Sequence, residues 1–275
     1  MKFKIWIFLS VVCLSCAQVG AQTQIDDQQV VDAIQLIRSE AASHRLILLG
    51  EMHGTQQIPK FVGKLVSTYT DDGPVLLGLE VHHSEQTALG RYLASDGGPN
   101  ARSALQASPF WNAKSVQHDG RRSYDMLDLI EQVRQLRVLG KDVDILPYDN
   151  PPDQTVDSQK RDKAMAVRLR HAYATLPRGR LLVLSGNVHA MLKRPSYAPA
   201  EMQTPMGVYL RDLVPYSVNI TANGGEFWAC TATCGAAAMP PSTQTSGRDS
   251  DGVYDLEIVL PRFTVARLIG ASPRP

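Results

Sequence analysis

The chain has 275 residues, with 28 lysines and arginines against 27 aspartates and glutamates, so its formal net charge is +1. Without a basic excess, we expect neither nucleic acid nor an anionic membrane surface as a partner. This length is enough for one sizeable α/β domain, and no internal repeat divides the chain.

The first 21 residues are typical of a secretory signal. Lys2 and Lys4 precede an apolar stretch that is too short to span a bilayer comfortably, and small residues then lead to a cleavage point after Ala21. We therefore expect a secreted or periplasmic protein whose single domain covers residues 22–275. An uncleaved anchor, or a lipoprotein attached through Cys16, is the alternative.

Helical and strand patterns then alternate along the chain. In chain order, they predict a helix over Asp26–Ser43, a strand over Arg45–Leu49, a helix over Gln57–Tyr69, a strand over Val75–Leu79, helices over Ser84–Leu93 and Ser123–Leu139, a strand over Asp142–Pro147, a helix over Val156–Leu176, and strands over Leu181–Ser185, Tyr216–Thr221 and Val253–Leu260. The polar stretch Gly97–Arg122 is predicted to form a helical cap.

The strands are almost wholly apolar, which predicts an α/β fold with a mostly parallel sheet covered by helices on both faces. The last two predicted strands lack a long helix between them, so we expect an antiparallel C-terminal extension. Residues 236–252 are rich in small and polar side chains and are predicted to be a loop or disordered insertion. In an oxidising compartment, Cys230 and Cys234 would form a local disulfide, and two thiols are too few for a closed zinc site.

Acidic residues and histidines follow three of the predicted strands. Glu51 and His53 come after the first strand, Glu80 ends the second, and His189 follows Gly186-Asn187 after the fourth. The loops that leave the carboxyl ends of parallel strands share one rim, where ligands bind. These side chains are therefore expected to converge.

Each of these groups also has a structural interpretation. Glu51 would cap the next helix and His53 would fill a turn, while Glu80 would form a buried salt bridge to offset the cost of its charge. His82 and His83 point in opposite directions if the strand continues, so at most one joins the site.

The third predicted strand ends at the same rim with Tyr148 and Asp149. Tyr148 is a candidate ligand, whereas Asp149 precedes Asn-Pro-Pro and is expected mainly to form a turn. Arg121 and Arg161 would bind an anionic group or neutralise the carboxylates, although exposed arginines are more often simply solvated. No serine nucleophile elbow, phosphate-binding loop or dinucleotide fingerprint is present. The available groups suit acid–base chemistry on water, or metal binding.

These motifs resemble the erythromycin esterase/ChaN-like superfamily, which is related to the Tiki/TraB proteins. The resemblance rests on Gly50-Glu51-Met52-His53-Gly54-Thr55, Glu80, Arg161-Asp-Lys-Ala-Met165-Ala166 and Gly186-Asn187-Val188-His189-Ala190. It implies an α/β fold with a helical cap and a pocket lined by Glu51, His53, Glu80 and His189, with Arg161 in support. Relative to the esterases one residue is missing between Glu51 and His53, which makes the segment more similar to ChaN-like proteins.

The resemblance implies two functions. The first is non-covalent binding of haem or another iron ligand, for which His53 and His189 are candidate ligands to iron. Tyr148 is a third candidate because of its predicted place at the rim, and it does not map onto a ligand of the family. The alternative is hydrolysis of an ester or peptide bond by a histidine general base, with a divalent metal ion held by Glu51, His53, Glu80 and His189 if one is used.

Overall fold

The computed structural model describes residues 27–112, 119–151, 158–230 and 233–270. The predicted signal segment and its cleavage point lie outside these residues. Among the described helices, none is both long and apolar enough to cross a membrane.

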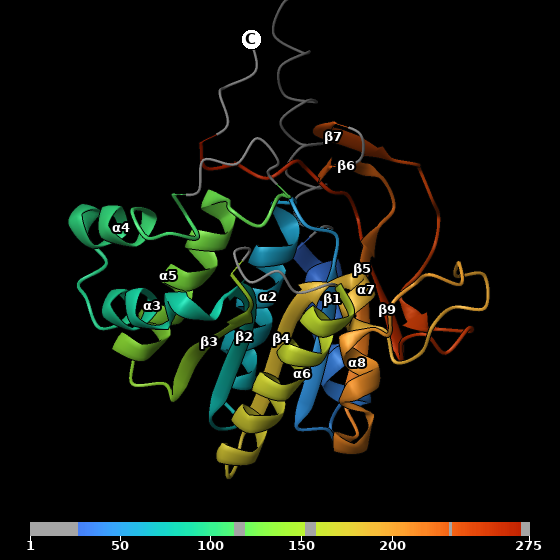
Figure 1. Ribbon diagram of the computed structural model, residues 1–275, viewed down its shortest axis with the longest axis horizontal. Coiled ribbons are helices and arrows are strands. Elements are labelled where there is room, and N and C mark those ends of the chain that lie inside the picture. The colour runs from blue at the N-terminus through green and yellow to red at the C-terminus, as the bar shows by residue number, and fades with distance from the viewer. Residues whose placement is uncertain (1–26, 113–118, 152–157, 231–232, 271–275) are drawn as a thin grey trace, which may run out of the picture.

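Seven strands form one sheet in the order β3-β2-β4-β1-β5-β9-β8 (Figure 1). Their bounds are β1 Leu46–Glu51, β2 Val75–His82, β3 Val143–Asp149, β4 Arg180–Gly186, β5 Tyr216–Ala222, β8 Gly247–Arg248 and β9 Leu256–Leu260. Every neighbouring pair is parallel except β8 with β9. The predicted α/β fold with a mostly parallel sheet is therefore confirmed.

Helices cover both faces of this sheet (Figure 1). They comprise a helix over residues 27–40, α2 Gln57–Tyr69, α3 Gln86–Leu93 after the 3-10 turn η1 His83–Glu85, α4 Pro99–Gln106, α5 Tyr124–Val138, α6 Ser158–Thr175, α7 Asn187–Ala190, α8 Met206–Tyr209 and the 3-10 turn η2 Arg211–Leu213. Helix α5 begins where the Ser123 hydroxyl accepts a hydrogen bond from the Met126 N–H at 3.1 Å.

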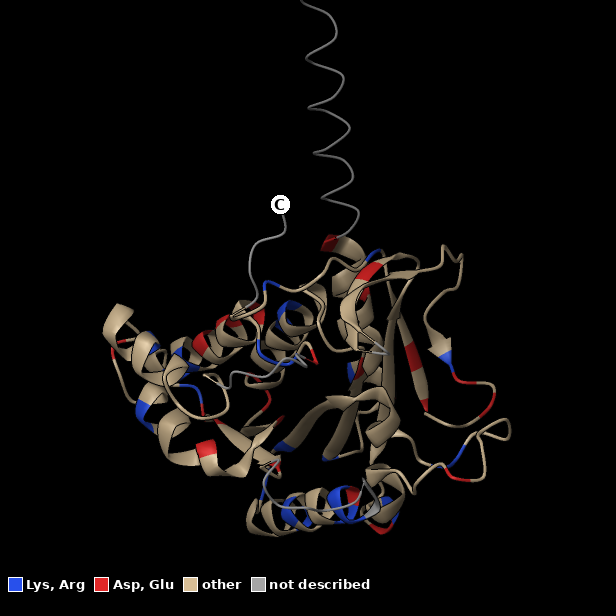
Figure 2. Cartoon of the chain, turned by 45° about the horizontal axis from the view of Figure 1, so that its top comes forward, with Lys and Arg blue, Asp and Glu red and all other residues tan. Residues whose placement is uncertain are grey.

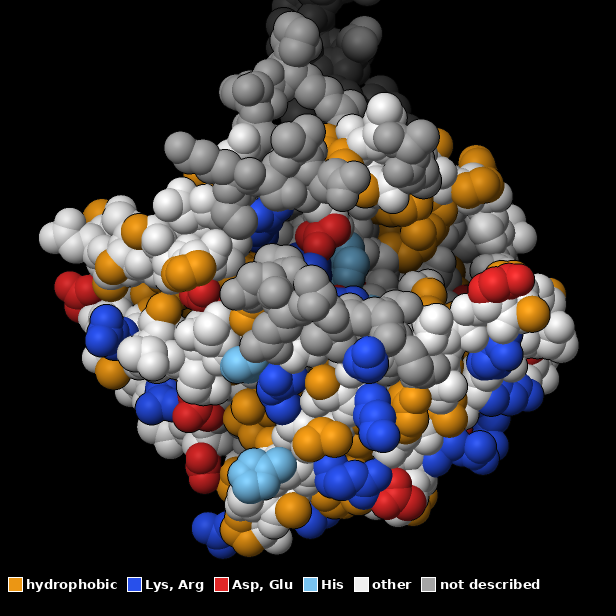
Figure 3. Space-filling model, viewed as in Figure 1, with side chains coloured by type: hydrophobic (Ala, Val, Ile, Leu, Met, Phe, Trp, Pro, Cys, Tyr) orange, Lys and Arg blue, Asp and Glu red, His pale blue; other side chains and the backbone are white. Residues whose placement is uncertain are grey.

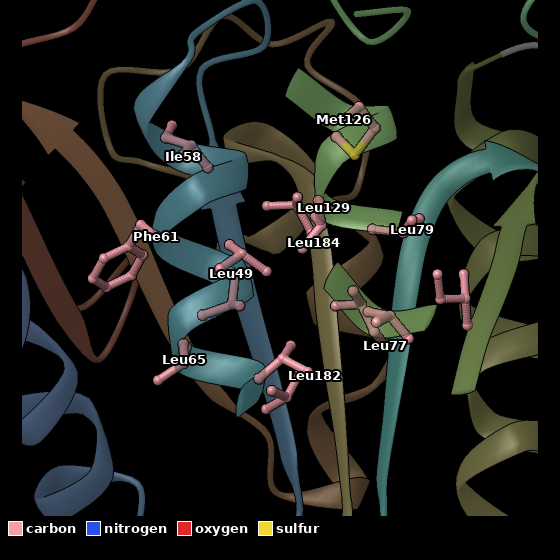
Figure 4. Packing of buried hydrophobic residues seen from close by; sticks show 14 of the residues in the cluster. Leu49, Ile58, Phe61, Leu65, Leu77, Leu79, Met126, Leu129, Leu182 and Leu184 are labelled. Atoms are coloured by element: carbon pink, nitrogen blue, oxygen red, sulfur yellow. The ribbon is translucent and has the colours of Figure 1, made fainter. Parts of the chain in front are cut away.

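The central strands β1 and β4 are mostly apolar, as expected of strands with both faces buried. In β1, Ile47 and Leu49 belong to the core beneath α2 and α5, which Figure 4 shows from close by. The alternate residues Leu46 and Leu48 belong to a second core beneath α6. Since successive strand side chains point to opposite faces, a short run of leucine and isoleucine fills both cores. Each fully buried side chain of this size contributes about 1.5–3 kcal/mol.

The predicted antiparallel C-terminal extension is confirmed, but it differs from the expectation in two details. Strands β5 and β9 pair parallel, and an antiparallel hairpin, β6 Gly225–Cys230 with β7 Cys234–Met239, lies between them in the chain. The connection is long enough to return the chain to the same end of the sheet, as a parallel pair requires. Residues 236–239 therefore belong to a strand rather than a loop. The hairpin is closed by the predicted Cys230–Cys234 disulfide.

Residues 113–118 of the predicted cap lie outside the described residues, and the described part of the cap is helical only at α4. Helix α4 packs on α3, beside α5. Residues 119–122 then return to the carboxyl end of the sheet, where a Cβ on Gly120 would lie 2.7 Å from the backbone of Gly54. The backbone at His53–Gly54 and the segment that carries Arg121 are therefore in direct contact.

Candidate active site

The order of the strands brings the carboxyl ends of β1, β2, β3 and β4 together. Strand β4 lies between β1 and β2, with Glu51 opposite Gly186, and His82 on β2 lies opposite Asp149 on β3. Figure 3 shows a hollow in which acidic, basic and histidine side chains meet. The structure thus gathers Glu51, His53, Glu80 and His189 at one end of the sheet.

Glu80 is the centre of this cluster and is only 6% exposed. One carboxylate oxygen accepts the Gly186 N–H at 2.7 Å, and the other accepts Arg161 Nη2 at 2.5 Å and Arg121 Nη1 at 3.2 Å. Burial opposes ionisation of this carboxyl, but His53, His189 and Arg121 together hold its pKa well below the usual range. Glu80 is therefore an ionised acceptor.

His53 is held between two carboxylates. Its Nδ1 lies 2.9 Å from Glu51 Oε1, and its Nε2 lies 3.6 Å from Glu80 Oε2. Burial alone would lower its pKa, but Glu80 and Glu51 outweigh that effect and raise the pKa of His53 to about 10. At neutral pH this histidine is an imidazolium, which donates protons and does not accept them.

His189 has a different environment. Its Nδ1 lies 2.7 Å from Asp162 Oδ1, and its Nε2 lies 3.0 Å from Arg161 Nη1. A guanidinium can only donate, so it must meet an unprotonated Nε2, and the proton sits on Nδ1 facing Asp162. In this tautomer the single lone pair of Nε2 accepts from Arg161, and Glu80 Oε1 lies 3.9 Å from the same nitrogen. A neutral imidazole oriented by a carboxylate is the arrangement that a general base requires.

Arg121 and Arg161 connect the cluster to β3 through hydrogen bonds with Asp149. Asp149 accepts hydrogen bonds from Arg161 Nε at 2.8 Å and from Arg121 Nη1 at 2.7 Å, and these overcome its burial to lower its pKa. Arg121 also binds Asp119 through Nε at 2.8 Å. Asp149 also accepts the N–H of Asn150, but its other contacts are with the two arginines of the site. The turn predicted over Asn150-Pro-Pro runs into residues 152–157, which lie outside the described part of the chain.

Glycine is required at two positions around the histidines. A Cβ on Gly186 would lie 3.1 Å from His53 Nε2, so a side chain there would enter the space that the two histidines share. Gly54 has a φ of +74°, and a Cβ there would lie 2.5 Å from that of Trp228. The Gly54 contact places the β6–β7 hairpin directly against the His53 loop.

Tyr148 does not lie at the rim. Its side chain belongs to the core beneath α6, and its hydroxyl donates a hydrogen bond to the Leu184 carbonyl at 2.8 Å. Burial raises its pKa well above the usual value. Side chains alternate along β3, so Tyr148 and Asp149 must face opposite ways. The expectation that both reach the rim is wrong.

The paired histidines at the end of β2, His82 and His83, are peripheral to the site. The His82 ring packs edge-on against Phe110 at 4.8 Å, and burial lowers its pKa. His83 begins the turn η1. Neither forms a hydrogen bond with Glu80 among the contacts of the described residues.

Three acidic residues of the cluster, Asp119, Asp149 and Asp162, were not predicted from the sequence to be site residues. Asp162 lies within the Arg161 motif, but its spacing from His189 gives no sign of contact. Asp149 was assigned a turn, and Asp119 lies in the irregular cap. The one available signal is for Asp162, because it and Arg161 are adjacent charged residues at the start of a helix that follows a rim strand.

As they are arranged among the described residues, the charged groups are paired with one another and do not fit a metal ion, or the iron of haem unless Arg161 leaves His189. Among the described residues, no group of three or more histidine, cysteine, aspartate or glutamate side chains is arranged to hold a metal ion. The oxygens of Glu80 and Asp149 accept guanidinium N–H groups, and so does His189 Nε2. Iron ligation needs a free lone pair, which protonated His53 and the buried Tyr148 hydroxyl do not offer.

No protein-family model matches the sequence, and a search of curated proteins finds no match. Solved structures do match. An erythromycin esterase, a mutant of EreC in its open conformation, is 11% identical with a TM-score of 0.64, covering 86% of this chain and 95% of that one. The chain has an erythromycin esterase-like fold.

Two further solved structures have related folds. A Bacillus cereus protein is 11% identical with a TM-score of 0.63, covering 86% of this chain and 93% of that one. A succinoglycan biosynthesis protein is 10% identical with a TM-score of 0.54, covering 86% and 92%. At these identities the likeness establishes the fold, and the chemistry must be argued from the residues of this chain.

The pKa of His53 makes a direct prediction. Its folded value, about 10, exceeds the value of about 6.5 for an unfolded histidine. The stability it contributes is therefore fully present below pH 6.5 and is lost as the pH rises through about 10. An NMR titration of the His53 ring should give a midpoint near 10, and Glu51→Gln should lower it. A midpoint near 6.5 in the native chain would show that the carboxylates do not control this ring.

Proposed function

We propose that this chain is a hydrolase that activates water for attack on an ester or peptide carbonyl. The observation that carries the proposal is the pair of carboxylate–histidine contacts, Glu51 with His53 and Asp162 with His189. Both rings turn Nε2 toward Glu80, so an acid and a base flank one small volume. The erythromycin esterase-like fold is consistent with a hydrolase.

His189 is the proposed general base. With its proton on Nδ1 facing Asp162, its Nε2 takes a proton from water as the water oxygen bonds to the carbonyl carbon. Arg161 must move from Nε2 for the water to bind there. Asp162 orients the ring and stabilises the imidazolium that forms, as carboxylates do in other histidine dyads.

His53 is the proposed acid. Its imidazolium and the adjacent guanidinium of Arg121 supply the positive charge that stabilises the oxyanion. When the bond to the leaving group breaks, His53 Nε2 gives its proton to the leaving oxygen or nitrogen, and Glu51 keeps the ring in place. The proton taken by His189 then returns to His53 through solvent, so the net change is the consumption of one water molecule.

The cellular location of the protein is also part of the proposal. The signal-like first 21 residues favour a secreted or periplasmic hydrolase, and the disulfide between Cys230 and Cys234 suits an oxidising compartment. The proposed substrate is a small molecule or peptide. Haem binding remains a prediction of the ChaN-like resemblance.

The test is a hydrolysis panel on the mature chain from Gln22 onward. Nitrophenyl acetate, nitrophenyl butyrate, a macrocyclic lactone and a casein digest would be assayed with and without EDTA. We expect turnover of at least one ester or peptide, and we expect it to survive EDTA because guanidinium groups occupy the carboxylates. No turnover on any substrate, together with a saturable Soret shift on adding haem, would replace the hydrolase with the haem-binding function.

A further inference from the structure

The last described segment, residues 261–269, returns along the rim after β9. Figure 1 shows this red segment crossing the top of the view toward α5. Its residues form isolated bridges with three distant parts of the chain, pairing Phe263 with Gly225, Val265 with Thr55, and Leu268 with Ser123. We infer that this segment, here called the C-terminal clasp, positions both loops that carry the proposed chemistry.

The first loop is the one after His53. The Gln56 N–H donates to the Thr264 carbonyl at 2.9 Å, and the Ala266 N–H donates to the Gly54 carbonyl at 2.9 Å. The Gln56 side chain adds a bond to the Val265 carbonyl at 2.9 Å. The polypeptide directly after His53 is therefore fixed to the clasp through its backbone and one side chain.

The second loop is the one that carries Arg121. The Tyr124 N–H donates to the Arg267 carbonyl at 2.8 Å, and the Ile269 N–H donates to the Arg122 carbonyl at 3.0 Å. Residues 122–124 thus pair with the clasp as a short antiparallel ladder. Arg121, which immediately precedes this ladder, extends from it to Glu80 and Asp149.

Arg267 anchors the clasp to α5. Its backbone N–H donates to Asp125 Oδ2 at 2.7 Å, and its Nε and Nη2 donate to Asp125 Oδ1 at 2.9 and 2.7 Å. Nη2 also donates to Asp128 at 2.6 Å. The two guanidinium donors converge on one Asp125 oxygen, and charge-assisted hydrogen bonds are stronger than neutral ones. Arg267 is remote from the reacting atoms, so it is a positioning residue.

The core contacts of the clasp do not depend on Arg267. Phe263 and Ala266 are 1% and 6% exposed and would keep the segment attached to the domain. Removing the guanidinium should therefore make the clasp and its backbone hydrogen bonds more mobile without unfolding the protein. Displacement of either loop by about 1 Å is enough to lower a catalytic rate by about 100-fold.

The experiment compares Arg267→Ala with Arg102→Ala. Arg102 also binds Asp128, at 2.6 Å, but does not touch the clasp, so it is a matched control. Amide hydrogen exchange is measured at Gly54–Gln56, at Arg121–Tyr124 and in β4. Turnover of the best substrate from the panel gives kcat and KM. We expect Arg267→Ala to speed exchange in both loops but not in β4, and to lower kcat by about 10- to 100-fold with little change in KM.

The turnover measurement rests on the proposed function, whereas the hydrogen-exchange measurement does not. Arg267→Lys, which keeps one charged donor, should recover part of both effects, whereas Arg102→Ala should behave as the wild type. Unchanged exchange in both loops of Arg267→Ala would overturn the clasp even if hydrolysis is confirmed. Faster exchange in a protein without any turnover would support the clasp and reject the hydrolase.

Discussion

Replacement of His189 by alanine is expected to lower hydrolysis by about 100- to 10,000-fold, the range typical of a lost general base. Asp162→Asn should give a loss of similar size, because an amide in place of the carboxylate no longer favours the proton on Nδ1. In both variants the fall should be in kcat. The assay is turnover of the best panel substrate at neutral pH, with circular dichroism as the check on folding.

The matched control is His171→Ala, which removes an exposed histidine from α6, the helix that carries Asp162. It should turn over substrate at the wild-type rate. Asp162 also accepts the Met206 N–H at 2.7 Å, and an asparagine Oδ1 can still accept it. Asp162→Asn therefore disturbs the structure less than Asp162→Ala would. A folded His189→Ala protein with an undiminished kcat would refute the assignment of His189 as the base.

Among the substitutions proposed in the site, loss of the Glu80 charge should lower the free energy of unfolding most. Glu80→Gln leaves Arg161, Arg121 and the His53 imidazolium with one carboxylate fewer in a largely buried site. Removing one partner of a buried ion pair typically costs about 3–5 kcal/mol. We expect about 3 kcal/mol, since Arg161 is 27% exposed and keeps its bonds to Asp149. Urea unfolding at pH 7 measures the difference.

The control for this change is Asp72→Asn. Asp72 pairs with Arg38 at 2.8 Å, with side chains 35% and 37% exposed, and losing such a surface pair should cost less than about 1 kcal/mol. Glu80→Gln should also lower the pKa of His53, because Glu80 is the strongest influence that raises it. Equal stability losses in the two variants would mean that Glu80 is not the centre of the charge cluster.

The basic character of α6 shows why single residues were harder to assign than the fold. Figure 2 shows this helix, at the bottom of the view, carrying many of the blue positions. Arg161 is one of several lysines and arginines in the sequence of α6, and Arg170 in the same helix binds Asp212 instead. Only packing against the strand ends distinguishes the arginine that enters the site from those that remain at the surface.

The sequence by itself determined the α/β class and the mostly parallel sheet, because apolar runs separated by helical periodicity permit few other arrangements. It also placed Glu51, His53, Glu80 and His189 at strand ends, and parallel strands must share the edge where those ends meet. The tertiary structure alone decided the partners. Long-range pairing joined Asp162 to His189 and Asp149 to the two arginines, although nothing in their spacing specifies contact.

The tertiary structure also decided which way the strands run and which way their side chains face. The pairing of β5 with β9 is parallel because the long connection between them returns the chain to the same end of the sheet. Tyr148 lies in the core because strand side chains alternate and its neighbour Asp149 takes the rim. Local sequence sets the periodicity of an element, whereas its register and neighbours depend on the packing of the whole chain.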